Sequence, residues 1–348
     1  MTALDAPLRI DPALRFALLN RWQHDFPLVD EPYARIGDAL GLEAAEVIAE
    51  YGALLEEGSV SRIGGVFGAG VGGCALLCAM AVPPARLEAV ARRVSAHTGV
   101  NHNYQREHRF NLWFVITGGA RDQVHAELSS LEQATGASAL RLEMQRAYVI
   151  DLGFDLHGRT AGDSLRGPLA RRSAAGAVLP VAPGERALAG LLEDGLPLTP
   201  QPFEPWASQL GLSPAAVLAT LARWLDAGTL RRFGVVVRHH ELGFAANAMT
   251  VFDVPDDAVD ALGSELARQP GVTLAYRRTR AAQWPYNLYC MVHGRDRASV
   301  QAALAQATQR AGLAHHAHEV LFSCRRFKQT GARYFRDATA QGAHHVHA

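Results

Sequence analysis

One segment of the chain places aromatic, basic and proton-transferring residues at every second position. These are His102, Tyr104, Arg106 and His108, and on a β-strand their side chains would share one face. Residues on one face follow each other at roughly 7 Å, so the four would extend across a large flat molecule. Arginine binds carboxylates through two parallel hydrogen bonds, and histidine exchanges protons near neutral pH. The segment is therefore typical of a surface that binds a planar anion and can protonate it.

A second segment repeats part of this pattern later in the chain. Tyr276 and Arg278 keep the Tyr-x-Arg spacing, whereas Leu274 stands at the position equivalent to His102. The two segments are alike in their aromatic and cationic residues but differ in the residue that can transfer a proton. We expect the first copy to carry the chemistry and the second copy mainly to bind.

Further candidates for ligand contact lie next to these two segments. They are Asn111, Trp113, Arg277, Trp284 and Tyr286. The aromatic residues also suit an ordinary hydrophobic core, and the asparagine also suits the end of a strand, where its side chain would satisfy backbone groups. For the asparagine and the aromatic residues the sequence leaves both interpretations open.

The composition excludes several classes of protein. The chain has 348 residues, no formal net charge and a pI near 7.3, so it lacks the basic field that attracts nucleic acid. Its four cysteines include no Cys-x-x-Cys pair, which argues against structural zinc and fits a reducing compartment. We find no signal peptide and no apolar run long enough to span a membrane. We therefore expect a cytoplasmic protein without membrane contact.

The chain contains the same unit twice. Glycines at positions 41, 58 and 73 recur at 211, 228 and 243 with constant spacing, which is the mark of an internal repeat. A segment rich in Arg, Ala, Gly and Pro separates the copies. The expected order is a winged helix-turn-helix over residues 12–62, a ferredoxin-like domain over 63–157, a linker over 158–184, a second winged helix-turn-helix over 185–232, a second ferredoxin-like domain over 233–337 and a flexible tail over 338–348.

Periodicity predicts the elements of each copy. Apolar residues at helical spacing over 43–56 and 213–226, each followed by glycine, indicate amphipathic helices with glycine C-caps. Strands and helices then alternate in the order βαββαβ, which is the ferredoxin-like arrangement. In copy one we expect strands at 74–82, 100–110, 111–117 and 140–150, with helices at 85–97 and 121–135. The fold class is thus α+β, a tandem repeat of winged helix and ferredoxin-like domain.

The predicted recognition helix of copy one is unsuited to DNA. Residues 43–57 contain five glutamates and no basic residue, whereas a recognition helix presents Arg, Lys, Asn or Gln to bases and phosphates. This helix would repel the phosphate backbone. We therefore expect the helix-turn-helix to act as a scaffold and expect no DNA partner.

Long motifs in both copies resemble one enzyme family. The winged helix followed by βαββαβ resembles the Lrp/AsnC regulators, and within that superfamily the motifs resemble siroheme decarboxylases. They are His-Asn-Tyr-Gln-Arg at 102–106, Asn-Leu-Trp-Phe at 111–114, Arg-Arg-Phe-Gly-Val-Val-Val-Arg-His at 231–239, Tyr-Arg-Arg at 276–278, Trp-Pro-Tyr-Asn-Leu-Tyr-Cys-Met-Val-His-Gly at 284–294 and Arg-Arg-Phe-Lys at 325–328. Two halves in one chain resemble the fused form associated with heme d1 synthesis in denitrifiers.

The resemblance implies a reaction. Siroheme would lose the carboxyl groups of its C12 and C18 acetates to give 12,18-didecarboxysiroheme, with no cofactor beyond the iron that the substrate carries. A homodimer and contacts with other enzymes of heme d1 synthesis are the protein partners that we consider. The rival interpretations are an Lrp/AsnC-type transcription regulator and a heme-binding protein without catalysis.

Roles follow for the candidate residues. His102 is the expected proton donor, Tyr104 and Tyr276 donate or orient, and Arg106 fixes carboxylates, so these four form the catalytic set. The remaining candidates would bind the substrate: His108, Asn111, Trp113, His239, Arg277, Arg278, Trp284 and Tyr286. His239 is also the candidate ligand of the siroheme iron.

Overall fold

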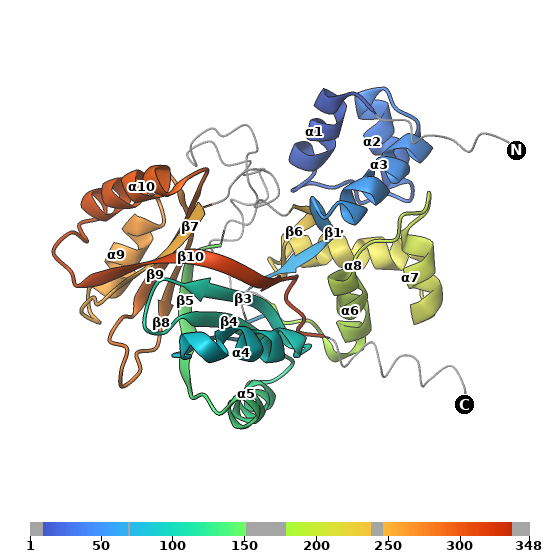
Figure 1. Ribbon diagram of the computed structural model, residues 1–348. Helices are drawn as coiled ribbons and strands as arrows, with labels where there is room; N and C mark the ends of the chain where they lie inside the picture. The colour runs from blue at the N-terminus through green and yellow to red at the C-terminus, as the bar shows by residue number, and fades with distance from the viewer. Residues whose placement is uncertain (1–9, 69, 151–178, 238–245, 336–348) are drawn as a thin grey trace, which may run out of the picture. The chain divides into compact units, whose positions relative to one another are not determined.

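The computed structural model describes residues 10–68, 70–150, 179–237 and 246–335 (Figure 1). Contacts divide the described chain into two units, each built from both copies. The helix-turn-helix unit combines the winged helices of the two copies, and the barrel unit combines their βαββαβ parts. None of the described helices has both the length and the apolar character needed to cross a bilayer.

The helix-turn-helix unit contains the same elements from each copy. Copy one supplies α1 (Pro12–Arg21), α2 (Pro32–Leu40), α3 (Ala44–Glu56) and β1 (Val60–Phe67). Copy two supplies η2 (Pro183–Glu185), α6 (Arg186–Asp194), α7 (Phe203–Leu210), α8 (Pro214–Asp226) and β6 (Leu230–Val237). Gly58 and Gly228 follow α3 and α8 with φ angles of 81° and 73°, a left-handed conformation that glycine adopts without strain. The two predicted amphipathic helices are confirmed.

The wing strands of the two copies pair with each other. β1 and β6 form an antiparallel two-stranded sheet in which Gly64 lies opposite Gly234. A Cβ atom would lie 2.7 Å from the Leu192 carbonyl oxygen at Gly64, and 2.4 Å from the Trp22 carbonyl oxygen at Gly234, so the close approach of these backbones requires glycine. The expected domain borders at 62/63 and 232/233 fall inside these two strands.

The barrel unit contains the βαββαβ order twice, which confirms the predicted fold class. Copy one supplies β2 (Cys74–Met80), α4 (Pro84–Ala96), β3 (Val100–Arg106), β4 (Leu112–Gly118), α5 (Arg121–Thr135) and β5 (Ala139–Ile150). Copy two supplies β7 (Ala246–Phe252), α9 (Val259–Leu266), β8 (Val272–Arg278), β9 (Leu288–Gly294), α10 (Arg297–Arg310) and β10 (His318–Gln329).

The two sheets join at both edges into one closed barrel. The strand order is β10-β3-β4-β2-β5-β8-β9-β7, and β10 pairs with both β7 and β3. The order repeats after four strands, so each copy-one strand lies opposite its copy-two equivalent. Two antiparallel seams connect the copies, β3 with β10 and β5 with β8. Because the barrel is closed, inward side chains of both copies share one interior.

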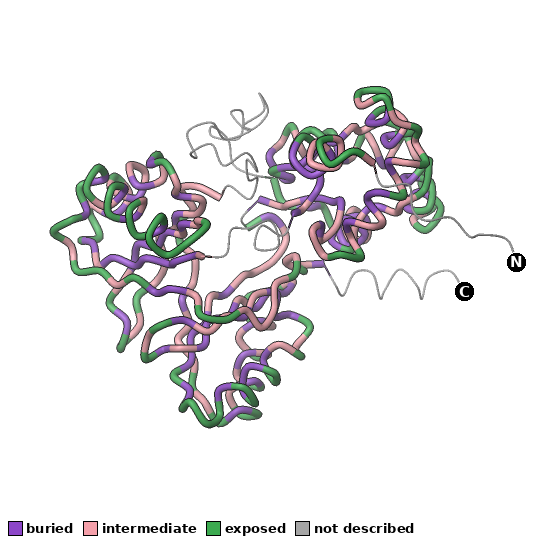
Figure 2. Tube along the Cα trace, turned by 45° about the horizontal axis from the view of Figure 1, so that its top comes forward, coloured by how far each residue is buried: buried purple, intermediate pink, exposed green. Residues whose placement is uncertain are grey.

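Each sheet has an outer face that packs on helices and an inner face that lines this interior. Leu76, Cys78 and Phe114 belong to the core under the copy-one helices, and Phe252, Cys290 and Val292 belong to the equivalent core of copy two. A third cluster combines inward residues of both copies: Ala79, Phe110, Trp113, Leu142, Met249, Val251, Trp284, Tyr289 and Leu321. In Figure 2 the barrel strands are mostly purple and pink, and green is concentrated on helices and connections.

The strand at 100–110 is shorter than its alternating pattern predicts. β3 ends at Arg106, whose backbone N–H donates to the Asn111 carbonyl oxygen at 2.9 Å and closes the hairpin to β4. His108 therefore lies in the hairpin connection, where its N–H donates to the Arg106 carbonyl oxygen. Alternation of residue types continues past the strand, but the backbone has already turned.

Candidate functional site

A bulge at the start of β3 and of β8 directs the candidate residues into the barrel. The register shifts between Val100 and His102, and between Val272 and Leu274. Both valines pack on the helix side, although residues two apart normally share a face. The shift turns the following positions inward, which is a common use of bulges next to functional sites.

Two tyrosine–arginine pairs face the interior from opposite sides. The Arg106 guanidinium lies 5.6 Å from the centre of the Tyr104 ring. The Arg278 guanidinium lies 5.1 Å from the centre of the Tyr276 ring and 5.8 Å from that of Tyr289. Each arginine thus rests on aromatic surface, an arrangement that favours a cation electrostatically. The structure brings together four of the residues singled out in the sequence.

Neither arginine has an acidic partner among the described residues. Arg106 is 6% exposed and donates to the Leu321 carbonyl oxygen at 3.0 Å and to Asn247 Oδ1 at 3.4 Å. Arg278 donates to the Leu142 carbonyl oxygen at 2.9 Å. The Nε atoms of both arginines are buried without a hydrogen-bond partner. A buried cation is costly unless a charge of opposite sign accompanies it, so an anion entering the interior would find two unneutralised charges and unused donors.

Burial changes the acid–base properties of these groups. It lowers the pKa of Arg106 from 12.5 to about 10 and also lowers the pKa of Arg278. Both remain charged at neutral pH. The lowered pKa values indicate that the ligand-free fold tolerates these cations at a cost in stability.

His102 is a neutral imidazole in the ligand-free barrel. Burial, and to a smaller extent the charge of Arg106, lowers the pKa of His102 from 6.5 to about 4. Its Nδ1 lies 3.1 Å from Asn101 Oδ1, and its ring stacks on Tyr104 with centroids 6.3 Å apart. The sequence suggested a group that titrates near neutral pH. The structure corrects this, because desolvation disfavours the charged form.

A polar contact from β10 reaches Tyr104. The Tyr104 hydroxyl donates to Gln329 Oε1 at 3.0 Å, and Arg326 Nη1 donates to the same oxygen at 3.3 Å. Arg326 lies directly opposite Tyr104 in the seam. The sequence patterns assigned neither Arg326 nor Gln329 a role. The Arg-Arg-Phe-Lys motif at 325–328 pointed to this strand, but nothing in the sequence marked Gln329.

Four other candidates gather in an aromatic cluster near the hairpin turns. Centroid distances to the Trp284 ring are 5.3 Å for His108, 5.2 Å for Trp113 and 4.9 Å for Tyr286. Trp113 and Trp284 are 2% and 1% exposed. Their indole N–H groups donate to the Phe110 carbonyl oxygen at 2.6 Å and to the Tyr289 hydroxyl at 2.7 Å. Both indole N–H groups thus have a hydrogen-bond partner, and the two rings pack against each other in the core.

Asn111 and its equivalent Asn287 hold neighbouring backbone. The Asn111 side chain accepts from Val82 N at 3.0 Å and donates to Val82 O at 2.8 Å. Asn287 makes the same pair of contacts with Val254, at 3.1 Å and 2.9 Å. Both therefore serve as strand-end residues, one of the two interpretations that the sequence left open.

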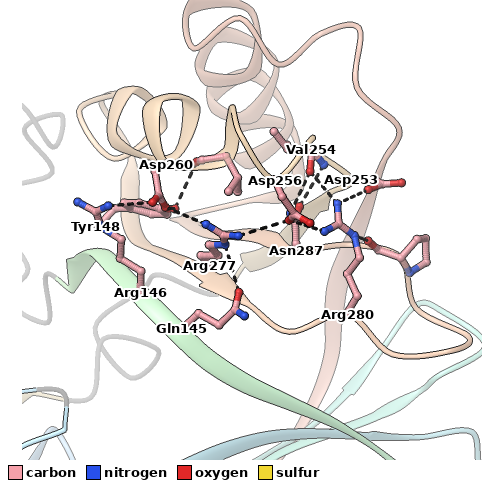
Figure 3. A network of polar contacts seen from close by, with 12 residues as sticks. Gln145, Arg146, Tyr148, Asp253, Val254, Asp256, Asp260, Arg277, Arg280 and Asn287 are labelled. Carbon is pink, nitrogen blue, oxygen red and sulfur yellow. Dashed lines mark hydrogen bonds and ion pairs between the residues drawn. The ribbon is translucent and has the colours of Figure 1, made fainter.

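Arg277 points towards Asp256 and Asp260, with Gln145 beside it (Figure 3). It donates to Gln145 Oε1 at 3.1 Å and pairs with Asp256 at 3.4 Å and Asp260 at 3.6 Å. Adjacent strand residues face opposite sides, so Arg277 and Arg278 cannot both line the interior. Its charge is already neutralised by carboxylates. The last candidate, His239, lies outside the described residues.

Comparisons with known proteins agree with this architecture. A family model for the siroheme decarboxylase NirDL-like HTH domain matches residues 16–60 and 185–231, and one for the AsnC-like ligand binding domain matches 71–148 and 241–328. The siroheme decarboxylase NirDL subunit of Paracoccus pantotrophus is 40% identical over 321 residues, which cover 92% of this chain and 96% of the relative. The NirD subunit of Stutzerimonas stutzeri is 49% identical over 144 residues, covering 41% of this chain and 95% of the relative.

A solved structure resembles the whole chain. The crystal structure of the siroheme decarboxylase NirDL in co-complex with an iron-uroporphyrin III analogue has a TM-score of 0.64 and 25% identity, covering 96% of this chain and 97% of that one. Full-length similarity to NirDL, half-length similarity to a NirD subunit and the duplicated fold are mutually consistent. This chain therefore belongs to the siroheme decarboxylase NirDL family.

Proposed function

We propose that this chain decarboxylates siroheme at the C12 and C18 acetates, giving 12,18-didecarboxysiroheme for heme d1 synthesis. Its relatives are named siroheme decarboxylases, and one was solved with an iron-uroporphyrin III analogue. The observation that carries the proposal is a pair of arginines, the buried Arg106 and the part-buried Arg278, which have no acidic partner among the described residues and whose Nε atoms are buried without a hydrogen-bond partner. A polycarboxylate would neutralise both.

Siroheme suits these residues in shape and charge. It is a flat macrocycle with eight carboxylates at its rim, and the two arginines face one interior from opposite strands. The rings of Tyr104 and Tyr276 supply aromatic surface beside each cation. We assign the arginines to carboxylates that stay on the substrate. An ion pair with the departing carboxylate would stabilise the ground state and slow the loss of carbon dioxide.

The reaction requires charge delocalisation and one proton at each site. When the bond between the methylene and carboxylate carbons breaks, carbon dioxide leaves and the electron pair stays on the methylene carbon. The macrocycle takes part of this charge, so the proposal needs no other cofactor. A proton then converts the methylene into a methyl group. Two such steps release two molecules of carbon dioxide and consume two protons.

We assign the proton transfer to His102. Its imidazole is neutral in the free barrel, with a pKa of about 4, but nearby substrate carboxylates favour the protonated form and would raise that pKa. The bound substrate would thus prepare its own proton donor. Exclusion of water by the closed interior would keep other proton sources away. His239 stays a candidate iron ligand on the resemblance alone.

We propose that the helix-turn-helix unit does not read DNA. Glu50 of α3 is 6% exposed and pairs with Arg15 at 2.8 Å. Arg223 of α8 is bound to Glu185. Glu50 and Arg223 are therefore paired within the chain, which supports a scaffold role. A homodimer and contacts with other enzymes of heme d1 synthesis stay predictions, as does the cytoplasmic location that the composition suggested.

One experiment separates the three functions. Siroheme is incubated with the protein without oxygen, and mass spectrometry follows the loss of two carboxyl groups. Unchanged siroheme that remains bound would indicate a heme-binding protein and would contradict the proposal. Absence of both binding and turnover, with a shift of genomic DNA fragments in a gel, would favour the transcription regulator.

A further inference from the structure

The two seams of the barrel differ at equivalent positions. β10 and β5 each have 12 residues. At the ninth position, Arg326 lies opposite Tyr104 in one seam and Ala147 lies opposite Tyr276 in the other. At the last position β10 has Gln329 and β5 has Ile150. At these two equivalent positions, β10 therefore places polar residues along its seam with β3, whereas β5 places apolar residues along its seam with β8.

We propose that Arg326 and Gln329, both from copy two, complete the reactive site around Tyr104 in copy one. Gln329 is a positioning residue for the Tyr104 hydroxyl, and Arg326 binds a substrate carboxylate. This inference rests on the proposed siroheme decarboxylation. It makes the site a composite of both copies, where the sequence suggested chemistry in copy one and binding in copy two.

The hydrogen bonds determine what the Tyr104 hydroxyl can do. It donates its proton to Gln329 Oε1 at 3.0 Å, so its remaining lone pairs are available to accept hydrogen bonds from other groups. Arg326 donates to the same oxygen at 3.3 Å. Two donors on one acceptor also fix the orientation of the glutamine amide, because its NH₂ group could accept neither. Tyr104 is therefore held as an acceptor and orienting group, which leaves the proton transfer to the adjacent His102.

The distribution of charge supports the role of Arg326. Burial raises the pKa of the Tyr104 hydroxyl, and the positive charges of Arg106 and Arg326 partly oppose this rise. Two cations thus lie near this tyrosine. Near Tyr276 the equivalent strand offers Ala147, and two positions before Tyr276 stands Leu274 in place of His102. Among the described residues, a carboxylate-rich rim would meet Arg106 and Arg326 at the β3–β10 seam and Arg278 at the β5–β8 seam.

The test uses variants of Gln329 and Arg326 in the full chain, with Ile150→Ala as the matched control at the equivalent position. Dissociation constants are measured by absorbance titration with iron-uroporphyrin III, and turnover is measured on siroheme without oxygen. Gln329→Ala should lower turnover about 10- to 100-fold, because the orienting contact is lost, with Kd changed less than about threefold. Gln329→Glu should recover most of the turnover, since a carboxylate accepts both hydrogen bonds. Ile150→Ala should change neither quantity.

A double-mutant cycle separates positioning from general structural damage. If Gln329 acts through the Tyr104 hydroxyl, Gln329→Ala should have no further effect on turnover in a Tyr104→Phe background. Additive losses would overturn the positioning role, as would equal losses in Gln329→Ala and Ile150→Ala. Thermal unfolding of each variant identifies those that fail to fold. If Gln329→Ala fails to fold, the turnover of Gln329→Glu decides the positioning role of Gln329.

The binding role of Arg326 is tested by the dissociation constant of its variants. Arg326→Gln should raise Kd for iron-uroporphyrin III about 10-fold or more, as expected for loss of a charge-assisted contact. Arg326→Lys keeps the positive charge and should recover part of the lost affinity. An unchanged Kd in Arg326→Gln would overturn its binding role. If the wild-type chain bound the ligand but left siroheme intact, the proposed function would fail, and the affinity of the Arg326 variants would still decide this part of the inference.

Discussion

Replacing Arg106 by methionine should have opposite effects on ligand affinity and on stability. Methionine keeps much of the side-chain volume and is flexible enough to fill the interior, but it carries no charge. Arg106 is 6% exposed and has no acidic partner among the described residues. If its purpose is to neutralise a substrate carboxylate, the substitution should weaken binding without harming the ligand-free fold.

The size of the effect on stability follows from the pKa of Arg106. Burial lowers it from 12.5 to about 10, which corresponds to about 3 kcal/mol against the charged form in the fold. The folded pKa lies below the unfolded one, so this penalty is fully present below pH 10 and disappears only as the pH rises towards 12.5. Arg106→Met removes this free-energy penalty, but it also removes the hydrogen bonds to the Leu321 carbonyl oxygen and to Asn247. Leaving a buried carbonyl without its donor costs about 1–3 kcal/mol. We therefore expect a free energy of unfolding that is unchanged or raised by up to about 2 kcal/mol.

The effect on affinity should be larger and of the opposite sign. Removing one partner of a buried charge pair costs about 2–5 kcal/mol in binding, which is at least about 30-fold in Kd. Absorbance titration with iron-uroporphyrin III measures Kd, and urea unfolding of the ligand-free protein measures stability. Arg278→Met should change both quantities in the same direction, because the Arg278 Nε is also buried without a hydrogen-bond partner and the guanidinium donates to the Leu142 carbonyl oxygen.

The neighbouring Arg277 provides the matched control. It lies one residue away on the outer face and pairs with Asp256 and Asp260, so Arg277→Met should leave Kd unchanged and lower stability by less than about 1 kcal/mol. The reasoning would be refuted if Arg106→Met retained wild-type affinity. It would also be refuted if Arg106→Met unfolded far more readily than Arg277→Met, because Arg106 would then be a structural residue.

Three further predictions concern proton transfer, acid stability and packing. His102→Ala should lower turnover about 10²- to 10⁴-fold, the usual contribution of a positioned acid. Because bound carboxylates should raise the pKa of His102 above 4, ligand binding near pH 5.5 should take up a proton. Calorimetry in buffers of different ionisation enthalpy should detect this uptake in the wild type, and its presence in His102→Leu would contradict the assignment. Burial and the charge of Arg232 lower the pKa of His24 to about 4. The unfolded chain binds this proton more tightly, so stability should be lost as the pH falls from 6.5 towards 4, and His24→Leu should unfold at a lower pH than the wild type. Trp284 is 1% exposed, so Trp284→Ala should cost about 3–5 kcal/mol in urea unfolding; a loss below about 1 kcal/mol would show that the aromatic cluster collapses into the space.

Local patterns in the sequence were sufficient to predict the elements. The helix expected at 43–56 is observed at Ala44–Glu56, and the strand expected at 140–150 is observed at Ala139–Ile150. Both depend on periodicity and terminating residues, which act over a few positions along the chain. The strand expected at 100–110 ends at Arg106, because a hairpin contact with Asn111 ends it before the residue pattern changes.

The sequence by itself thus determined the duplicated fold and the two tyrosine–arginine pairs, since repeats and two-residue spacings are visible along one chain. Only the tertiary structure decided that these pairs share an interior, because this depends on β3 pairing with β10 and on β5 pairing with β8. Strand pairing joins residues that are far apart in sequence, as Tyr104 and Gln329 are, and it places Arg278 inside and Arg277 outside. The lowered pKa of His102 has the same origin. Burial is a property of the assembled barrel, and no spacing of residues along the chain can report it.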